Sequence, residues 1–142
     1  MIRTACLAAT LALAGNVLAQ NVCTSTLAAS SCGPTLTATF TPNGNAGNHD
    51  LELTCHGLDP NGIGLMVWGL TQVNIPLPNC PMLNDFIWGH VVNLDATGSH
   101  SWSRSWPASV NGYYYVQFGS VTFPANGGFV VLTTDSIRIE CN

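Results

Sequence analysis

The sequence predicts an all-β fold: a single antiparallel β-sandwich domain, jelly-roll or Ig-like, with about eight strands and with disulfide bonds. From Thr35 onward, short segments rich in β-branched and aromatic residues alternate with clusters of Gly, Asn and Pro. No stretch keeps a helical period of apolar residues for three turns. Short strands bounded by turn residues, without amphipathic helices between them, are typical of sandwiches.

Eight segments carry the strand pattern, and the turn signals fall between them. The expected strands are Thr35–Thr41, Asp50–His56, Gly64–Leu70, Phe86–Val92, Ser99–Trp106, Tyr113–Phe118, Gly128–Leu132 and Ser136–Cys141. Asn-Gly pairs stand at residues 43–44, 61–62, 111–112 and 126–127. Because Asn and Gly tolerate positive φ in tight turns, these pairs support the expected boundaries.

Two connecting segments are expected at the ends of the sandwich. Residues 43–48 contain only Asn, Gly and Ala and have the composition of a loose loop. Residues 76–81 contain three prolines, which cannot donate a hydrogen bond to a sheet ladder. We therefore place this second segment outside any sheet interior.

The segment Ser99–Trp106 alternates strictly, with Ser on one face and His100, Trp102, Arg104 and Trp106 on the other. If the aromatic face is the core, the Ser face is a plain neutral surface and the arginine lies at a strand end or under a ring. If the aromatic face is exposed, its rings and guanidinium form a platform of the kind that binds sugar rings. Burial is the commoner fate of Trp in a small sandwich, but the pattern itself leaves both interpretations open.

The next strand carries a second group of aromatic residues. Its period places Tyr114, Val116 and Phe118 on one face, which is the better core face. Tyr113 and Tyr115 fall on the other face and are expected at the surface. The candidate ligand-binding residues are Trp102, Arg104, Trp106, Tyr113 and Tyr115, with Trp88 as a further candidate.

Residues 1–19 have the form of a signal peptide. A positive charge at Arg3 precedes the apolar run Cys6–Ala14, and a small residue, Ala19, precedes Gln20. The run is shorter than the roughly 20 residues that span a bilayer. We therefore expect export, a secreted and extracellular chain, and no membrane insertion.

The remaining chain is expected to form one domain. Removing residues 1–19 of the 142 leaves 123, enough for a single core. We expect an N-terminal arm over residues 20–31, loose unless Cys23 ties it down, and the sandwich domain over residues 32–142.

Charge excludes some partners. Without the signal peptide the chain has two arginines, Arg104 and Arg138, no lysine and seven acids, a formal charge of −5. Binding to nucleic acid depends on neutralising phosphates with Lys and Arg. Neither nucleic acid nor an anionic lipid surface is an expected partner.

Five cysteines follow the signal peptide: Cys23, Cys32, Cys55, Cys80 and Cys141. In an exported chain the default expectation is disulfide bonds. An odd count leaves one cysteine unpaired or bonded to another chain, so a disulfide-linked dimer is one expectation. Sequence alone does not select among the possible pairings.

No metal or cofactor site is expected. The four histidines are widely spaced, and no C-x-x-C motif occurs; they are His49, His56, His90 and His100. A calcium site built from Asp50, Asn43 and Asn45 has too few carboxylates.

No catalytic residues are expected either, and the chain is not predicted to be an enzyme. Ser99, His100 and Asp95 stand too close in sequence to project into a catalytic triad, and no G-x-S-x-G motif precedes them. The acids occur singly, whereas glycoside hydrolysis commonly needs an opposed pair.

The order of several motifs is familiar: "CGPTLTATF", "HDLELTCHGL", "GIGLMVWGLTQVNIPLPNCPML", "WPASVNGYYYVQFGSV" and "LTTDSIRIEC". Over residues 32–141 the chain resembles a family of short secreted β-sandwich domains of unknown function from planctomycete-type and related bacteria. The resemblance implies an extracellular domain with no catalytic residues. It also implies a Cys32–Cys80 bridge, and secondly a bridge from Cys23 or Cys55 to Cys141.

Three classes of function are consistent with these features. The first is a non-catalytic extracellular module with a structural or cell-surface role, which predicts buried Trp and Tyr side chains. The second is a carbohydrate-binding or adhesive module, with an extracellular glycan as partner, which predicts exposed aromatic side chains. The third, a small secreted hydrolase or inhibitor, requires clustered carboxylates or histidines and is the least favoured.

Overall fold

The computed structural model describes residues 22–43, 48–107 and 109–142, which form eleven β-strands and no helix. The strands are β1 (Cys23–Ala29), β2 (Thr35–Pro42), β3 (His49–His56), β4 (Ile63–Gly69), β5 (Gln72–Ile75), β6 (Met82–Asn84), β7 (Trp88–Asn93), β8 (His100–Trp106), β9 (Gly112–Thr122), β10 (Val130–Thr133) and β11 (Ser136–Cys141).

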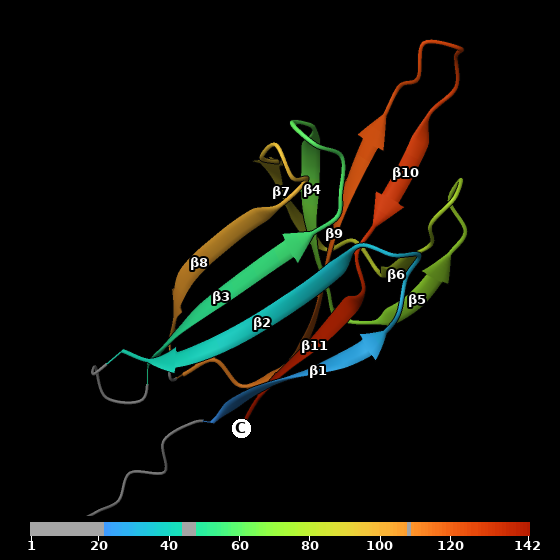
Figure 1. Ribbon diagram of the computed structural model, residues 1–142. Coiled ribbons are helices and arrows are strands. Elements are labelled where there is room, and N and C mark those ends of the chain that lie inside the picture. The colour runs from blue at the N-terminus through green and yellow to red at the C-terminus, as the bar shows by residue number, and fades with distance from the viewer. Residues whose placement is uncertain (1–21, 44–47, 108) are drawn as a thin grey trace, which may run out of the picture.

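The strands build two main antiparallel sheets that pack face to face (Figure 1). The larger sheet has the order β1-β11-β9-β4-β7, with β10 paired to β9, and the smaller sheet has the order β2-β3-β8. The hairpin of β9 and β10 extends beyond the rest of the molecule at the upper right of Figure 1. The expected all-β, antiparallel, disulfide-containing sandwich is confirmed, with more strands than the predicted eight.

The core lies between the two sheets. Leu51 and Leu53 of β3 are fully buried, and so are Met66, Phe118 and Ile139 of the larger sheet. Each lies on the inward face of its strand, as the period of two requires. At about 1.5–3 kcal/mol for each fully buried side chain of this kind, burial in this layer is the main force that joins the sheets.

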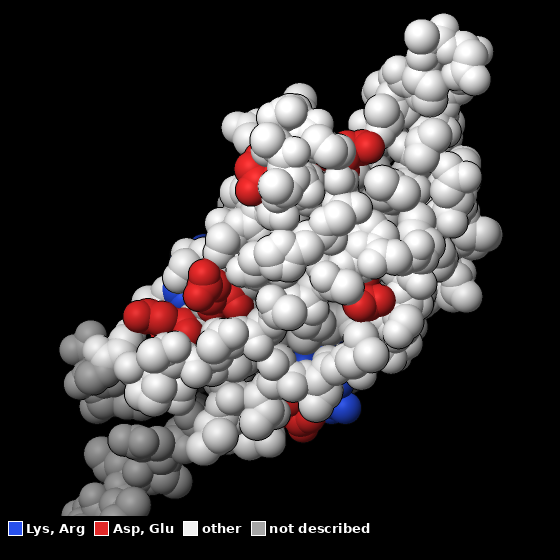
Figure 2. Space-filling model, viewed as in Figure 1, with Lys and Arg blue, Asp and Glu red and all other residues white. Residues whose placement is uncertain are grey.

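The outer face of the smaller sheet carries mostly hydroxyl groups. Thr37, Thr54 and Ser101 lie side by side in register, and the Thr54 and Ser101 hydroxyls are 3.2 Å apart. Ser101 also donates to Glu52. Figure 2 shows the acidic side chains of this view in separate groups, with no continuous charged patch.

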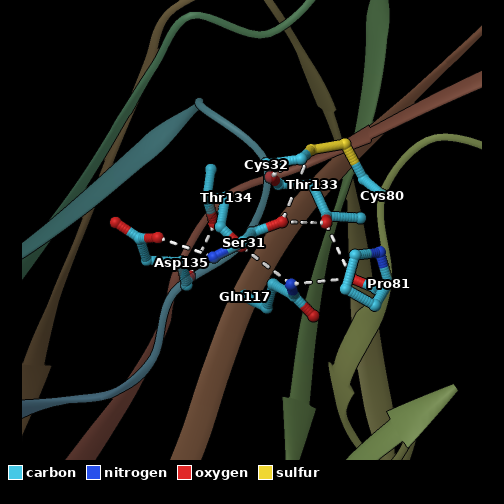
Figure 3. The surroundings of a disulfide bond; sticks show 8 residues. All are labelled: Ser31, Cys32, Cys80, Pro81, Gln117, Thr133, Thr134 and Asp135. Carbon is cyan, nitrogen blue, oxygen red and sulfur yellow. Dashed lines mark hydrogen bonds between the residues drawn. A yellow bond between two sulfur atoms is a disulfide. The ribbon is translucent and has the colours of Figure 1, made fainter. Parts of the chain in front are cut away.

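The short β5–β6 hairpin covers part of the outer face of the larger sheet. The Gln117 side chain accepts a hydrogen bond from the Leu83 N–H at 2.8 Å and donates to the Thr134 carbonyl at 2.8 Å. Its amide also donates to the Pro81 carbonyl at 3.4 Å (Figure 3). This glutamine is buried, so three hydrogen bonds offset the cost of removing its amide from water.

A disulfide also holds the same hairpin. The Cys32–Cys80 bridge joins the β1–β2 connection to the loop between β5 and β6. Beside it, the Ser31 and Thr133 hydroxyls lie 2.7 Å apart, and Thr133 donates to the Pro81 carbonyl (Figure 3). The three-proline segment is thus a fixed connection between β5 and β6.

A second disulfide, Cys23–Cys141, links the first and last strands. The two cysteines are direct partners in the β1–β11 ladder, with 4.1 Å between their Cα atoms. Val22 and Asn142 continue the pairing through two backbone hydrogen bonds. In its described part, the N-terminal arm expected over residues 20–31 is therefore tied down as an edge strand of the sandwich.

Each of the eight expected strands has a counterpart within a few residues, and β1, β5 and β6 are additional. The bridges match the pairing that the family resemblance implied, and they leave Cys55 free and fully buried. The expected signal peptide, residues 1–19, lies outside the described residues. No helix in the described ranges is long and apolar enough to cross a membrane.

Candidate functional site: an aromatic pocket at the open side of the sandwich

A pocket of about 480 Å³ opens where β8, the edge strand of the smaller sheet, faces β4 and β7 of the larger one. Its lining comes from the ends of these strands and from the start of β9: Trp68, Gly69, Leu70, Ile87, Trp88, Trp102, Arg104, Ser105, Trp106, Pro107, Val110 and Tyr114. The volume falls within the range of about 300–1,000 Å³ that is usual for small-molecule sites.

All four tryptophans of the chain line this pocket. The Trp68 ring is at the centre, stacked on Trp106 at 5.8 Å between ring centroids and 18° between planes. Trp102 meets Trp68 edge-on at 5.8 Å, and Trp88 lies 6.2 Å away. Tyr114 contacts Trp106 edge-on at 5.6 Å. These distances are typical of favourable aromatic pairs.

The position of β8 explains why its rings are half-buried. Its ladder pairs Trp102 with Leu53 and Arg104 with Leu51, and both leucines are fully buried. The His-Trp-Arg-Trp face of β8 is therefore the inward face. Because β8 is an edge strand, that face lies at the open side of the sandwich and keeps contact with solvent.

Exposure of the four rings is graded. Trp68 is only 6% exposed, and Trp102 and Trp106 are half-buried. Trp88, at the start of the edge strand β7, is 42% exposed. Neither sequence interpretation describes this face fully, since it is both the edge of the core and the wall of an open pocket.

The polar groups of the pocket have few partners. The indole N–H groups of Trp68 and Trp106 are buried and have no hydrogen-bond acceptor among the described residues. Arg104 is exposed, and in the described part of the chain it makes no hydrogen bond or ion pair. Of these groups only the Arg104 side chain is open to solvent, so it is the hydrogen-bond donor that the pocket presents beside its large aromatic faces.

Tyr113 and Tyr115, the other two predicted ligand-binding residues, lie elsewhere. They project from the outer face of the larger sheet, with their rings 6.1 Å apart. Arg138 lies over the Tyr113 ring at 5.0 Å and forms a 3.0 Å ion pair with Glu140. The structure thus brings together three of the five primary candidates and places these two tyrosines outside the pocket.

Trp68 and Tyr114 line the pocket although the strand pattern did not indicate them as site residues. Trp68 pairs with Trp88 across the β4–β7 ladder, and it reaches β8 only through the packing of two sheets. A strand period shows which face a side chain occupies, but it does not show which strand lies opposite. The one signal in the sequence for this contact was a further Trp on the inward face of a strand in the other sheet.

The histidines and acids form no comparable site. No group of three or more His, Cys, Asp or Glu side chains that could hold a metal occurs within the described ranges. Asn43 donates to the Asp50 carboxylate, and residue 45 of the imagined calcium site lies outside the described residues.

One serine–histidine contact is present on the outer face of the smaller sheet. His56 Nδ1 lies 2.9 Å from Ser99 Oγ. The nearby Asp95 carboxylate accepts hydrogen bonds from the Thr97 hydroxyl and from the Thr97 and Ser99 N–H groups, which lower its pKa. This carboxylate caps a turn and does not orient the histidine, and neither His56 nor Ser99 lines the aromatic pocket.

A second, larger groove of about 840 Å³ lies on the outer face of the larger sheet. Strands β4, β9 and β10 form its floor, and Leu77 and Met82 flank it. Several apolar side chains there are open to solvent, including Ile63, Val91 and Phe123. The described residues that line it include no charged side chain.

Comparison with known proteins gave no relative: no protein-family model, no curated protein and no solved structure matches this chain. The two disulfides fit an oxidising environment such as the extracellular space.

Proposed function

We propose that this chain is a secreted, non-catalytic binding module that holds a sugar ring in the aromatic pocket. One observation carries the proposal: all four tryptophans of the chain surround a single open pocket. A fold that needed tryptophan only as core filling could distribute the rings through the core. Here only Trp68 belongs to the buried core, and the other three tryptophans keep contact with solvent at the pocket.

The chemistry of the lining favours a saccharide. The C–H faces of a sugar ring pack on flat aromatic surfaces, and its hydroxyls accept hydrogen bonds from N–H donors. Trp88 and Trp102 supply partly exposed faces, while Arg104 supplies a polar group beside them. Such a mixture of apolar walls and a few polar groups is typical of ligand sites.

Secretion is part of the same proposal. The predicted signal peptide and the two disulfide bonds both support an extracellular location. An extracellular glycan is then the partner that the pocket would meet.

The test is binding to a glycan array and to insoluble polysaccharides, followed by titration calorimetry with the strongest oligosaccharide. Trp88→Ala removes the most exposed ring of the pocket and is expected to weaken binding at least tenfold. Phe123→Ala is the matched control, because Phe123 is 77% exposed and lies outside the pocket. If the wild-type chain binds no glycan, or if Trp88→Ala binds as well as wild type, the proposal is wrong.

The second candidate is the structural or surface-associated role, and the apolar groove on the larger sheet favours it. Exposed apolar patches commonly mark protein interaction sites. Because the groove has no charged lining, two copies of this acidic chain could approach there without like-charge repulsion. This candidate predicts a dimer in light scattering that Val91→Asp converts to a monomer; a monomeric wild-type chain would exclude it.

A further inference from the structure

We propose that Arg104 makes the aromatic pocket selective for acidic sugars, so that its ligand is a saccharide containing uronic acid residues. This inference rests on the proposed function and names the ligand class of the same site. It is carried by the charge inventory of the chain and by the surroundings of this arginine.

Positive charge is scarce in this chain and half of it is at the pocket. Beyond residues 1–19 the only arginines are Arg104 and Arg138, and there is no lysine. Arg138 is occupied by Glu140 and lies over the Tyr113 ring. The Arg104 side chain has no ion pair, hydrogen bond or aromatic ring as a partner among the described residues. Of these two cationic side chains, that of Arg104 therefore lies beside the aromatic walls without a partner among the described residues.

The position of Arg104 suits a ligand that lies on the rings. It stands between Trp102 and Trp106 on the inward face of β8. Alternate residues of a strand are about 6.8 Å apart, so the backbone positions of both tryptophans are about one sugar unit from that of Arg104. A guanidinium binds a carboxylate through two parallel hydrogen bonds, which fixes orientation as well as charge.

Among the described residues no acid lines the pocket, so a carboxylate would meet no like charge on these walls. The Asp85 carboxylate accepts hydrogen bonds from the Leu70 and Thr71 N–H groups. Leu70 lines the pocket, but Asp85 does not. A neutral sugar would leave the Arg104 guanidinium partly desolvated beside apolar rings without a partner, whereas a carboxylate offsets that cost.

A single arginine in an acidic chain recognises one carboxylate and does not attract a dense polyanion. The expected ligand is therefore a short stretch of uronic acid that occupies one ring site. Affinity should fall moderately with salt, because one partly exposed ion pair is screened over about 8 Å at physiological ionic strength.

The test uses tetrasaccharides of galacturonic acid and of mannuronic acid, each with its methyl ester as the matched neutral probe, together with cellotetraose. Binding is measured by titration calorimetry with wild type, Arg104→Gln and Arg138→Gln. We expect an acidic tetrasaccharide to bind wild type at least tenfold more tightly than its ester. Arg104→Gln should remove this preference, and Arg138→Gln, which loses the same charge outside the pocket, should keep it.

The outcomes separate this inference from the proposed function. If acid and ester bind equally, or if only cellotetraose binds, acid selectivity is overturned and sugar binding stands. If Arg104→Gln keeps the preference for the acid, the role of Arg104 is overturned. If no probe binds and the glycan array is also negative, both proposals fail.

Discussion

Removal of the Cys23–Cys141 bridge should cost more stability than removal of the Cys32–Cys80 bridge, although both are single covalent links. The outer bridge spans 118 residues of sequence and the inner one spans 48. The inner loop lies wholly within the outer one. When the inner bridge is intact, the shortest covalent path from Cys23 to Cys141 passes through it and is about 70 residues long. The loop-closure entropy of the outer bridge is calculated for this shorter loop.

The chain-entropy model then gives the two magnitudes. Replacing Cys23 and Cys141 by Ala while the inner bridge stays intact should lower the free energy of unfolding by about 4.5 kcal/mol. Replacing Cys32 and Cys80 by Ala while the outer bridge stays intact should lower it by about 3.5 kcal/mol. A small domain has about 5–15 kcal/mol in total, so either loss is large.

Urea unfolding followed by tryptophan fluorescence is the appropriate assay. All four tryptophans lie around the pocket and none is on β1, so the signal reports separation of the sheets and not fraying of the edge strand. Amide exchange of β1 measures that fraying separately. If loss of the outer bridge costs under about 1 kcal/mol, or clearly less than loss of the inner bridge, the loop-entropy argument is refuted for this fold.

Three further predictions concern buried or strained positions. Cys55 is fully buried, so a thiol reagent should label the native chain no faster than it unfolds; fast labelling, or a disulfide-linked dimer on a non-reducing gel, would contradict the buried placement. Burial also raises the pKa of the Cys55 thiol. Its contribution to stability should be complete below the ordinary thiol pKa of about 8.5 and decline as pH rises above it, and a Cys55→Ala variant should show a shallower decline in urea unfolding. Gly98 has a φ of 72°, and a Cβ there would collide with the Leu58 backbone, so Gly98→Ala should cost about 1–3 kcal/mol or more, seen as a lower Tm. An unchanged Tm would show that this turn is not strained.

The central strands could be predicted because their inward faces alternate with polar outward faces. β3 is an example: Leu51, Leu53 and Cys55 point inward while Glu52 and Thr54 point outward. This alternation is local information, and it fixes the face of each residue regardless of what packs against it.

The additional strands lack that local signal. β1 has only one buried side chain, that of Cys23, and the strand is held by β11 and by the Cys23 bridge. β5 and β6 are only four and three residues long and flank prolines, and their place depends on Gln117 and on the Cys32–Cys80 bridge. Their structure comes from long-range contacts, which a strand pattern does not contain.

The same division applies to the site. The strip of Trp102, Arg104 and Trp106 was predictable as one face of one strand. Its partner Trp68 was not, because its contact with these rings depends on how the two sheets are stacked. Tyr113 is exposed, as the pattern predicts, and Tyr115 is half-buried; both lie on the opposite side of their sheet from the pocket.

The disulfide and the hydrogen bonds that join the two ends of the described chain have a mechanical consequence. Val22 and Asn142 are hydrogen-bonded to each other, and the adjacent cysteines are covalently joined with 4.1 Å between their Cα atoms. A force that pulls residue 22 away from residue 142 would be carried by the Cys23–Cys141 bond after breaking only the terminal hydrogen bonds. The rest of the sandwich, and the aromatic pocket within it, would bear no load until that bond was reduced.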